Sequence, residues 1–478
     1  MTRRLALLLG MSALSACSME PHYERPAAPV PASFPAGDPY LLQTEANLPA
    51  VRYQDLFTDA RVQQLVTQAL ANNRDLRIAA ANIASARAQY KIQRADLLPE
   101  IDAGGRFNVG DTGTSTGGQG GVDTSFNANI GVTAFEIDLF GRVRSLTHAA
   151  LDQYFATEAA GRGTRLTLVG DIATAWLNYA ADKSLLKIAE ETAKSAQVSV
   201  RLTNARLQGG VAPRTDLRQA EIVLHQAESD LEESRTQLAQ DVNALQLLVG
   251  APIDTALLPD SIESVVDSFK PLPAGLSSDV LLRRPDVVQA EYQLRAANAE
   301  IGAARAALFP KLSLTGLAGF ASNALFALFD RGTFAWSVAP QISYPLFRAG
   351  AGRAGVAQSE AQRDAALATW EKAVQTAFRE TADALARRGT IADQEKAQIA
   401  LVTSSADNFR LSEARYRGGI DTYLASLLAQ RSLYTAQRSL VQTRLMRATN
   451  LVTLYKVLGG DSQLDATADG PKELSPQQ

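Results

Sequence analysis

The sequence contains a single cysteine, Cys17, among 478 residues, so no disulfide can form within the chain. Acidic and basic residues nearly balance, with 47 Lys and Arg against 50 Asp and Glu. This balance excludes the basic surface that nucleic-acid binding requires. After Ala16, no apolar run is long enough for a helix that crosses a bilayer. If the chain crosses a membrane, it must therefore do so with strands.

Histidine is also scarce, and the sequence offers no catalytic or cofactor site. The three histidines, His22, His148 and His225, are far apart and lack metal-ligand spacing. The stretch GGQGG at Gly117 lacks the helix and the Lys-Ser/Thr pair of a phosphate-binding loop. It is interpreted as an exposed loop between two strands. We therefore expect no enzymatic activity, no metal and no cofactor.

The N-terminus has the layout of an export signal. Two arginines precede a short apolar run, and small residues precede Cys17 in the stretch LSAC. This stretch resembles the bacterial lipobox, in which the cysteine is lipidated and becomes the new N-terminus. We expect residues 1–16 to be the signal peptide and residues 17–50 to be a lipid-anchored, extended segment. The alternative is a buried free cysteine.

The chain is a tandem duplication. ARLQGGVAPRTDLRQAE from Ala205 aligns without a gap with ARYRGGIDTYLASLLAQ from Ala414, an offset of 209 residues. A second pair of matching segments ends near Gly105 and Leu317. We predict repeats at 51–262 and 263–460, each with a helix, a β-hairpin and a long helical hairpin. A flexible tail is expected at 461–478.

Each half contains one very long helical stretch. Residues 141–208 and 348–417 contain no proline and are rich in helix formers, and each would reach about 100 Å if fully helical. Glycine doublets follow both stretches and are expected to end the helices at tight tips: Gly209, Gly210, Gly418 and Gly419. Two antiparallel helical hairpins in a coiled-coil sheath are predicted, a pattern that soluble scaffolds share.

The predicted β-hairpins cover about 99–140 and 310–346. Apolar and polar residues alternate along them, as in SFNANIGVTA and FAWSVAPQIS, and segments of about 10 such residues fit membrane strands. The phase of the alternation flips at Phe135, which indicates a bulge. A soluble β-sandwich edge is the alternative, and Pro340 slightly favours it or else marks a bend.

Two hairpins give four strands per chain, which is too few to close a barrel, and lipid does not tolerate an open edge. A dimer would give an eight-stranded barrel filled by side chains, whereas a trimer would give twelve strands and room for a lumen. We therefore expect an α+β membrane protein. Its trimeric 12-stranded β-barrel would have four strands per chain and continue into a long α-helical coiled-coil tunnel in the periplasm.

The sequence resembles the TolC-like outer membrane factor family, in particular the NodT-type lipoproteins of RND efflux systems. The resemblance covers nearly the whole mature chain. It rests on the lipobox at Cys17, on LFTDARVQQLVTQALANNRDL, on LLRRPDVVQAEYQLRAANAEIGAARAALFPKLSLTG, on YPLFRAGAGRA and on ARYRGGIDTYLASLLAQRSLYTAQRSLV. It implies a homotrimer in the outer membrane of a Gram-negative bacterium, docked on a periplasmic adaptor and an RND-type inner-membrane pump. The hairpin tips at the glycine doublets would contact the adaptor.

The resemblance also implies a periplasmic gate near the second tip. Tyr416, Arg417 and Asp421 match the aromatic, arginine and carboxylate of that pattern, and Leu424 is a candidate hydrophobic constriction. Leu428 stands where related proteins often have an acidic residue, which puts a second acidic ring in doubt. The alternative is that Arg417 and Asp421 are solvated tip residues. In the first half, Asp216 is a weaker gate candidate.

The main functional hypothesis is a passive export duct for drugs or other small molecules. Two alternatives remain open at this point. One is the outer-membrane duct of a type I protein or peptide secretion system, and the other is a lipid-anchored helical scaffold that forms no pore.

Overall fold

The computed structural model describes residues 18–40, 52–111, 122–270 and 277–473. The chain divides into two compact units, and each unit takes segments from both halves of the sequence. The first comprises 1–27, 82–157 and 289–370, and the second comprises 28–81, 158–288 and 371–478. The predicted signal peptide, Cys17 and the GGQGG stretch lie outside the described residues.

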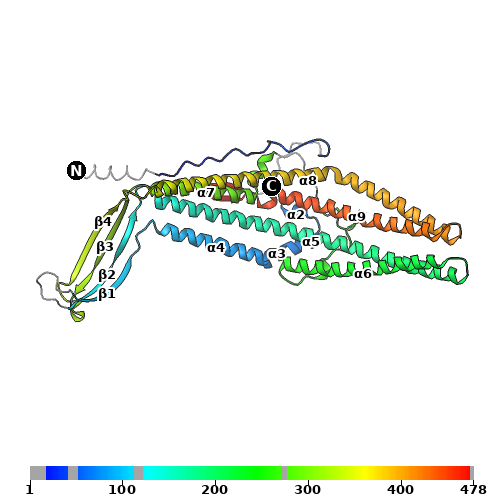
Figure 1. Ribbon diagram of the computed structural model, residues 1–478, viewed down its shortest axis with the longest axis horizontal. Coiled ribbons are helices and arrows are strands. Elements are labelled where there is room, and N and C mark those ends of the chain that lie inside the picture. The colour runs from blue at the N-terminus through cyan, green and yellow to red at the C-terminus, as the bar shows by residue number, and fades with distance from the viewer. Residues whose placement is uncertain (1–17, 41–51, 112–121, 271–276, 474–478) are drawn as a thin grey trace. The chain divides into compact units, whose positions relative to one another are not determined.

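The first unit contains a four-stranded antiparallel sheet in the order β1-β2-β3-β4 (Figure 1). The strands are β1 (Asp102–Asp111), β2 (Val122–Ile137), β3 (Lys311–Ser322) and β4 (Phe334–Ser343). Both predicted hairpins are therefore confirmed. Within the described residues, β1 and β4 each pair on one side only, and Pro340 lies in β4, opposite Leu314 of β3.

The predicted bulge is confirmed in β2. Val132 pairs with Gly316 and Phe135 pairs with Leu314, so three steps along β2 match two steps along β3. Ala134, within the bulge, has a φ of +54°, which is uncommon for a residue other than glycine. The extra residue keeps Phe135 on the face that carries Val132, which explains the flip in the sequence pattern.

The register places the two alternating sets on opposite faces of the sheet. Directly paired residues share a face, and Phe126 indeed stacks on Phe107 with ring centroids 4.7 Å apart. The apolar face carries Phe107, Phe126, Ile130, Val132, Phe135, Leu314, Phe320, Phe334, Trp336, Val338 and Ile342. The polar face carries Asp102, Arg106, Asn127, Asn129, Glu136, Ser313, Thr315, Ser337 and Gln341, with Leu317 as its one large apolar residue.

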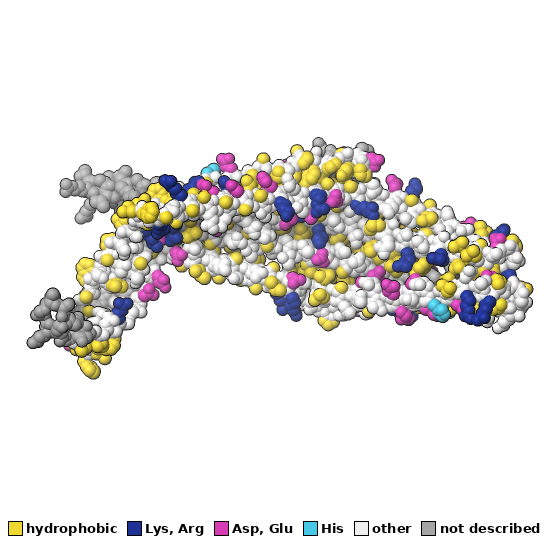
Figure 2. Space-filling view, in the orientation of Figure 1, with side chains coloured by type: hydrophobic (Ala, Val, Ile, Leu, Met, Phe, Trp, Pro, Cys, Tyr) yellow, Lys and Arg dark blue, Asp and Glu magenta, His cyan; other side chains and the backbone are white. Residues whose placement is uncertain are grey.

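The long helical hairpins are confirmed. α5 (Arg142–Gln208) and α8 (Ala351–Arg417) each run for 67 residues, and α6 (Arg214–Val249) and α9 (Tyr423–Val457) follow them. The shorter helices are α2 (Tyr53–Leu56), α3 (Ala60–Asn72), α4 (Arg74–Ala95) and α7 (Pro285–Ala306). Among the described helices, none is both long and apolar enough to cross a bilayer. Figure 2 shows charged side chains distributed along these helices.

The core of the second unit is packed around aromatic residues. Trp176 on α5 is fully buried, and its indole Nε1 donates to the carbonyl oxygen of Leu257 at 2.9 Å. Phe57 lies against Phe269 and Tyr455, with ring centroids 5.3 and 6.0 Å away. These contacts join segments that are far apart in the sequence.

In the first unit, residues 18–27 form an extended segment that we call the N-terminal strap. The side-chain amide of Asn298 on α7 donates to the carbonyl oxygen of Pro21 at 2.8 Å. A Cβ atom on Gly302 would lie 2.7 Å from the Cα atom of Glu20. Glycine is therefore required where the strap crosses α7.

The prediction of a flexible tail from residue 461 is wrong for the residues that the structure describes. β5 (Leu464–Thr467) and β6 (Gly470–Glu473) form a short antiparallel hairpin. Leu464 is buried, and Gly470 has a φ of +114° at the turn. Asp461 accepts hydrogen bonds from Arg165 and Tyr455, each at 2.8 Å. These contacts fix the start of a segment whose polar composition suggested a free tail.

Candidate functional site

The sequence singles out the tips of the two helical hairpins, and both tips end their first helix with the same turn. At the second tip, Gly419 has a φ of +74°. Its N–H donates to the carbonyl of Tyr416 at 3.0 Å, and the N–H of Ile420 donates to the carbonyl of Arg415 at 2.9 Å. This pair of bonds is a Schellman motif. The first tip repeats it, with bonds of 3.0 Å from Gly210 to Leu207 and from Val211 to Arg206.

Only the second glycine of each doublet needs glycine for its backbone. Gly210 and Gly419 have positive φ, whereas Gly209 and Gly418 do not. A Cβ atom on Gly418 would lie 3.4 Å from the carbonyl oxygen of Ala414, which is ordinary contact. The predicted ends of α5 and α8 are therefore confirmed. In each doublet, only the second residue must be glycine.

Tyr416 lies inside the protein. Its side chain packs with Tyr423, Leu427 and Ala220 in a group that we call the tip cluster, which joins the second hairpin to α6 of the first. The Tyr416 and Tyr423 rings meet edge to face with centroids 5.3 Å apart. Burial raises the pKa of the Tyr416 phenol, and among the described residues its hydroxyl has no hydrogen-bond partner.

Arg206, at the end of α5, holds the two tips together. Its guanidinium lies 4.8 Å from the centre of the Tyr416 ring, and its Nη1 donates to the Tyr416 carbonyl oxygen at 2.8 Å. This is the second bond that the Tyr416 carbonyl oxygen accepts, after the one from Gly419. It places the Arg206 cation at the C-terminal end of α8, where the helix dipole favours a positive charge. Partial burial raises the pKa of the nearby Asp216 carboxyl, and Arg206 opposes that shift.

Arg206 was not predicted as a site residue from the sequence, although the repeat carries the signal. With the offset of 209 residues, Arg206 corresponds to Arg415, and Ala212 corresponds to Asp421. Arg415 donates to Asp421 in its own tip, at 2.5 and 3.2 Å. Arg206 has no such acid six residues later, and it reaches the other hairpin.

The predicted gate residues do not form one cluster within the chain. Asp421 pairs with Arg415, and Arg415 lowers the pKa of its carboxyl. Arg417 pairs with Glu413, one turn earlier, at 2.6 Å. Leu424 is 49% exposed. An ion pair between Arg417 and Asp421 is thus absent from the described chain.

The start of α9 presents an exposed apolar stripe. Leu424 and Leu428 are one turn apart on α9, and both are about half exposed, at 49% and 54%. Ile420, in the turn before α9, is 67% exposed. Leu428, which departs from the acidic residue expected by resemblance, therefore extends the hydrophobic surface at Leu424.

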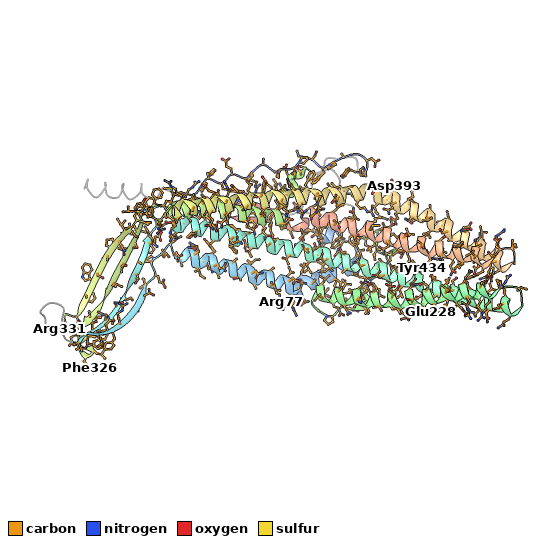
Figure 3. The ribbon with its side chains drawn as sticks, viewed as in Figure 1. Arg77, Glu228, Phe326, Arg331, Asp393 and Tyr434 are labelled. Atoms are coloured by element: carbon orange, nitrogen blue, oxygen red, sulfur yellow. The ribbon has the colours of Figure 1, made fainter. Side chains whose placement is uncertain are left out.

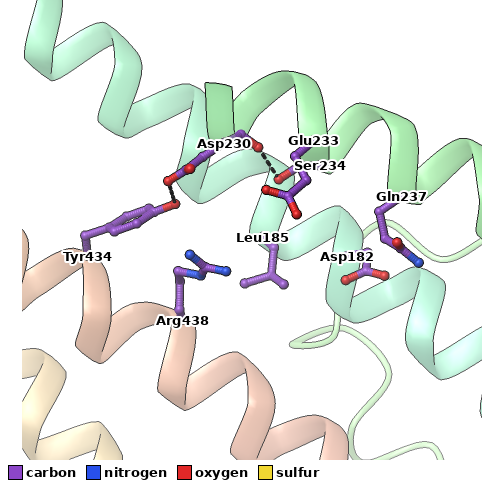
Figure 4. Close-up of a pocket in the computed structure, with 8 residues that line it drawn as sticks. All are labelled: Asp182, Leu185, Asp230, Glu233, Ser234, Gln237, Tyr434 and Arg438. Carbon is purple, nitrogen blue, oxygen red and sulfur yellow. Dashed lines mark hydrogen bonds between the residues drawn. The ribbon is translucent and has the colours of Figure 1, made fainter. Parts of the chain in front are cut away.

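A second feature of this unit is a cavity of about 140 Å³ between α5, α6 and α9. Tyr434 on α9 (Figure 3) donates to the carboxylate of Asp230 on α6 at 2.8 Å, and burial raises its pKa to about 12. Burial and the neighbouring Asp241 raise the pKa of Asp182 to about 7. The lining comprises Asp182, Leu185, Asp230, Glu233, Ser234, Gln237, Tyr434 and Arg438 (Figure 4).

The cavity contains carboxylates and one arginine, but within the described residues no three His, Cys, Asp or Glu side chains are arranged to hold a metal ion. The bond from Tyr434 to Asp230 instead crosses from one helical hairpin to the other. This hydrogen bond fastens α9 to α6 at a point away from the tip cluster.

Comparison with known proteins agrees with the duplication and identifies the relatives. A family model described as outer membrane efflux protein matches residues 65–251 and again residues 276–460. The chain is 44% identical over 461 residues to the toluene efflux pump outer membrane protein TtgC and to the antibiotic efflux pump outer membrane protein ArpC, both of Pseudomonas putida. Each alignment covers 95% of both chains.

Among solved structures, the chain is similar to the open state of the MtrE outer membrane channel of Neisseria gonorrhoeae. The TM-score is 0.81 at 36% sequence identity, and the match covers 94% of this chain and 100% of that chain.

Proposed function

Because the chain belongs to the outer membrane efflux protein family and is an outer-membrane component of an efflux pump, we propose that three copies close into one 12-stranded barrel. The observation that carries this proposal is the four-stranded sheet with two free edges. A sheet edge exposes unpaired N–H and C=O groups, which lipid cannot satisfy. Pairing β4 of one copy with β1 of the next removes every edge, and twelve strands leave an open lumen.

In this barrel, the apolar face contacts lipid and the polar face lines water. The register supports this orientation, because nearly every large apolar residue of the four strands lies on one face. Trp336 and Val338 are 71% and 59% exposed in the single chain. Such exposure is expected of residues that meet lipid rather than a protein core.

The helical hairpins then form the periplasmic tunnel, and their tips meet a periplasmic adaptor that links them to an inner-membrane pump of the RND type. The cargo is small and apolar or amphipathic, and the duct does not select it. In support, relatives with the same identity and coverage are named for different cargo, toluene in one case and antibiotics in the other.

The closed state is held by the second hairpin at its tip. Leu424 and Leu428 from three copies would form a hydrophobic constriction, which accounts for their exposure in the single chain. Arg417 and Asp421 would lie near the axis, but each already has a partner in its own chain. Ion pairs between subunits would therefore compete with those contacts.

We also propose that Cys17 is lipidated after removal of residues 1–16. The strap that follows Cys17 is fastened to α7, so the lipid and the barrel would anchor the same unit.

A pair of adjacent substitutions in β4 tests the barrel. Val338→Arg places a charge on the apolar face and should cost about 2–4 kcal/mol if that face meets mid-bilayer lipid. Ser337→Arg is the matched control on the polar face and should be tolerated. The readouts are trimer yield on a native gel in mild detergent and conductance in planar bilayers. Equal tolerance of both changes would contradict the orientation, and an intact monomer without conductance would favour the scaffold without a pore.

A further inference from the structure

The loop between β3 and β4, residues 323–333, exposes large apolar side chains, and we call it the tip loop. Phe326 is 99% exposed, Phe329 is 71% exposed and Leu325 is 55% exposed. Exposed apolar groups gathered in this way mark an interaction surface. Figure 2 shows hydrophobic side chains at this end of the sheet, and Figure 3 places Phe326 and Arg331 there.

The exposure is built into the loop by its backbone. A short 3₁₀ turn (Leu325–Ala327) is closed by the bonds from Ala327 to Ala324 and from Leu328 to Leu325, both at 3.2 Å. The Thr333 hydroxyl donates to the carbonyl oxygen of Leu328 at 2.7 Å. Leu328 is buried by this arrangement, at 7% exposed, while its neighbours remain outside. The loop therefore presents Leu325 and Phe326 in a fixed way.

The aromatic contacts show which face of the sheet the loop continues. Phe329 packs edge to face on Phe320, with centroids 5.2 Å apart, and Phe320 packs in the same way on Phe334 at 5.8 Å. Phe320 and Phe334 both belong to the apolar face. The tip loop thus extends the apolar face beyond the ends of the strands, and it does not continue the polar face.

We propose that the tip loop inserts Leu325, Phe326 and Phe329 into the lipid beside the outer rim of the barrel, so that it lies on the membrane and not across the channel mouth. This inference rests on the proposed barrel, whose apolar face meets lipid. Aromatic residues are favoured at the rims of membrane barrels, and the neighbouring Asp330 and Arg331 can remain at the headgroup level. The occupant is a lipid surface because the loop is continuous with the lipid-facing side of the sheet.

Nitroxide labels in the full-length trimer test this placement, in vesicles of phosphatidylethanolamine and phosphatidylglycerol. Phe326→Cys reports on the loop, and Arg331→Cys is its matched control. Val338→Cys and Ser337→Cys report on the two faces of the sheet. Unmutated protein, carried through the same labelling, corrects for any label on Cys17. Collisions are measured with oxygen, which concentrates in lipid, and with a water-soluble nickel chelate.

The ratio of oxygen to nickel collisions should be several-fold higher at positions 326 and 338 than at positions 331 and 337. A nickel-accessible label at 326, with the label at 338 in lipid, would overturn the tip-loop placement and leave the barrel intact. A label at 326 that neither reagent reaches would place a second copy over the loop, which also overturns the proposal. A nickel-accessible label at 338 would contradict the barrel orientation itself. If the label at 326 prevents assembly, Leu325→Cys replaces it as the reporter.

Discussion

Arg206→Ala should loosen the contact between the two hairpin tips. The side chain makes two interactions with Tyr416, one with its ring and one with its carbonyl oxygen. A guanidinium over an aromatic ring contributes about 0.5–2 kcal/mol, and a hydrogen bond from a charged donor contributes about 1.5–3 kcal/mol. Because Arg206 is partly exposed and the two terms share one side chain, we take about 2 kcal/mol for the pair.

This value corresponds to a shift of about 30-fold between docked and separated tips. Hydrogen exchange of the amides that close the second tip, at Gly419 and Ile420, measures it directly. Their exchange should accelerate by up to about that factor in Arg206→Ala, with exchange in the core of α5 around Trp176 unchanged. Single-channel conductance should rise in parallel if the tip cluster keeps the channel closed.

The matched control is Arg415→Ala, the equivalent arginine of the second repeat. Its ion pair with Asp421 is exposed to solvent, which screens the two charges. It should therefore alter exchange at the tip far less than Arg206→Ala does. Equal exchange in the two variants would contradict a role of Arg206 in holding the tips together. A double-mutant cycle between Arg206→Ala and Tyr416→Leu that shows no coupling would contradict it as well.

Three further predictions concern other parts of the chain. Burial raises the pKa of Asp152 from 3.8 to about 7, so its ionisation destabilises the fold progressively as the pH rises from about 4 to 7. Asp152→Asn should therefore raise the melting temperature at pH 8 and leave it nearly unchanged at pH 4. A gain in melting temperature of the same size at both pH values would contradict this. Cys17→Ser should abolish lipidation and normal processing yet leave the trimer folded, and mass spectrometry that finds an unmodified Cys17 in the wild-type protein would disprove the anchor. Leu424→Ser should raise single-channel conductance. The control is Leu247→Ser, at a leucine on α6 that is 80% exposed, and it should leave the conductance unchanged. Equal conductance of the two variants, measured in intact trimers, would place the constriction elsewhere.

Much of the fold could be predicted because its signals are local. Alternation along β2 predicted the strand, and the flip at Phe135 predicted the bulge, since the side-chain period of a strand is two. The ends of α5 and α8 could be predicted within a few residues because glycine adopts the left-handed conformation at low cost. The offset of 209 residues predicted that both tips would share one geometry.

The contacts within the candidate site could not be predicted in the same way. The partner of Arg206 lies 210 residues away in the sequence, and no local pattern links the two. Tyr416 was interpreted as a gate residue by resemblance, and the packing of its ring in the tip cluster was not part of that prediction. The short strands β5 and β6 were missed because four residues each are too few to show a period. The contact of Arg206, the packing of Tyr416 and the β5–β6 hairpin all depend on packing between segments that are far apart in the sequence.

The bulge in β2 has a consequence for how the protein can change over time. A single-residue insertion or deletion in a regular strand moves every later side chain to the opposite face, which in a membrane wall would exchange lipid-facing and water-facing groups. At residues 133–134 the ladder already holds one extra residue between Val132 and Phe135. Loss of that one residue would restore a regular ladder with Phe135 and Ile137 still opposite Leu314 and Leu312. Loss of one residue here would therefore leave the two faces of the sheet unchanged, whereas the same loss elsewhere in β2 would exchange them.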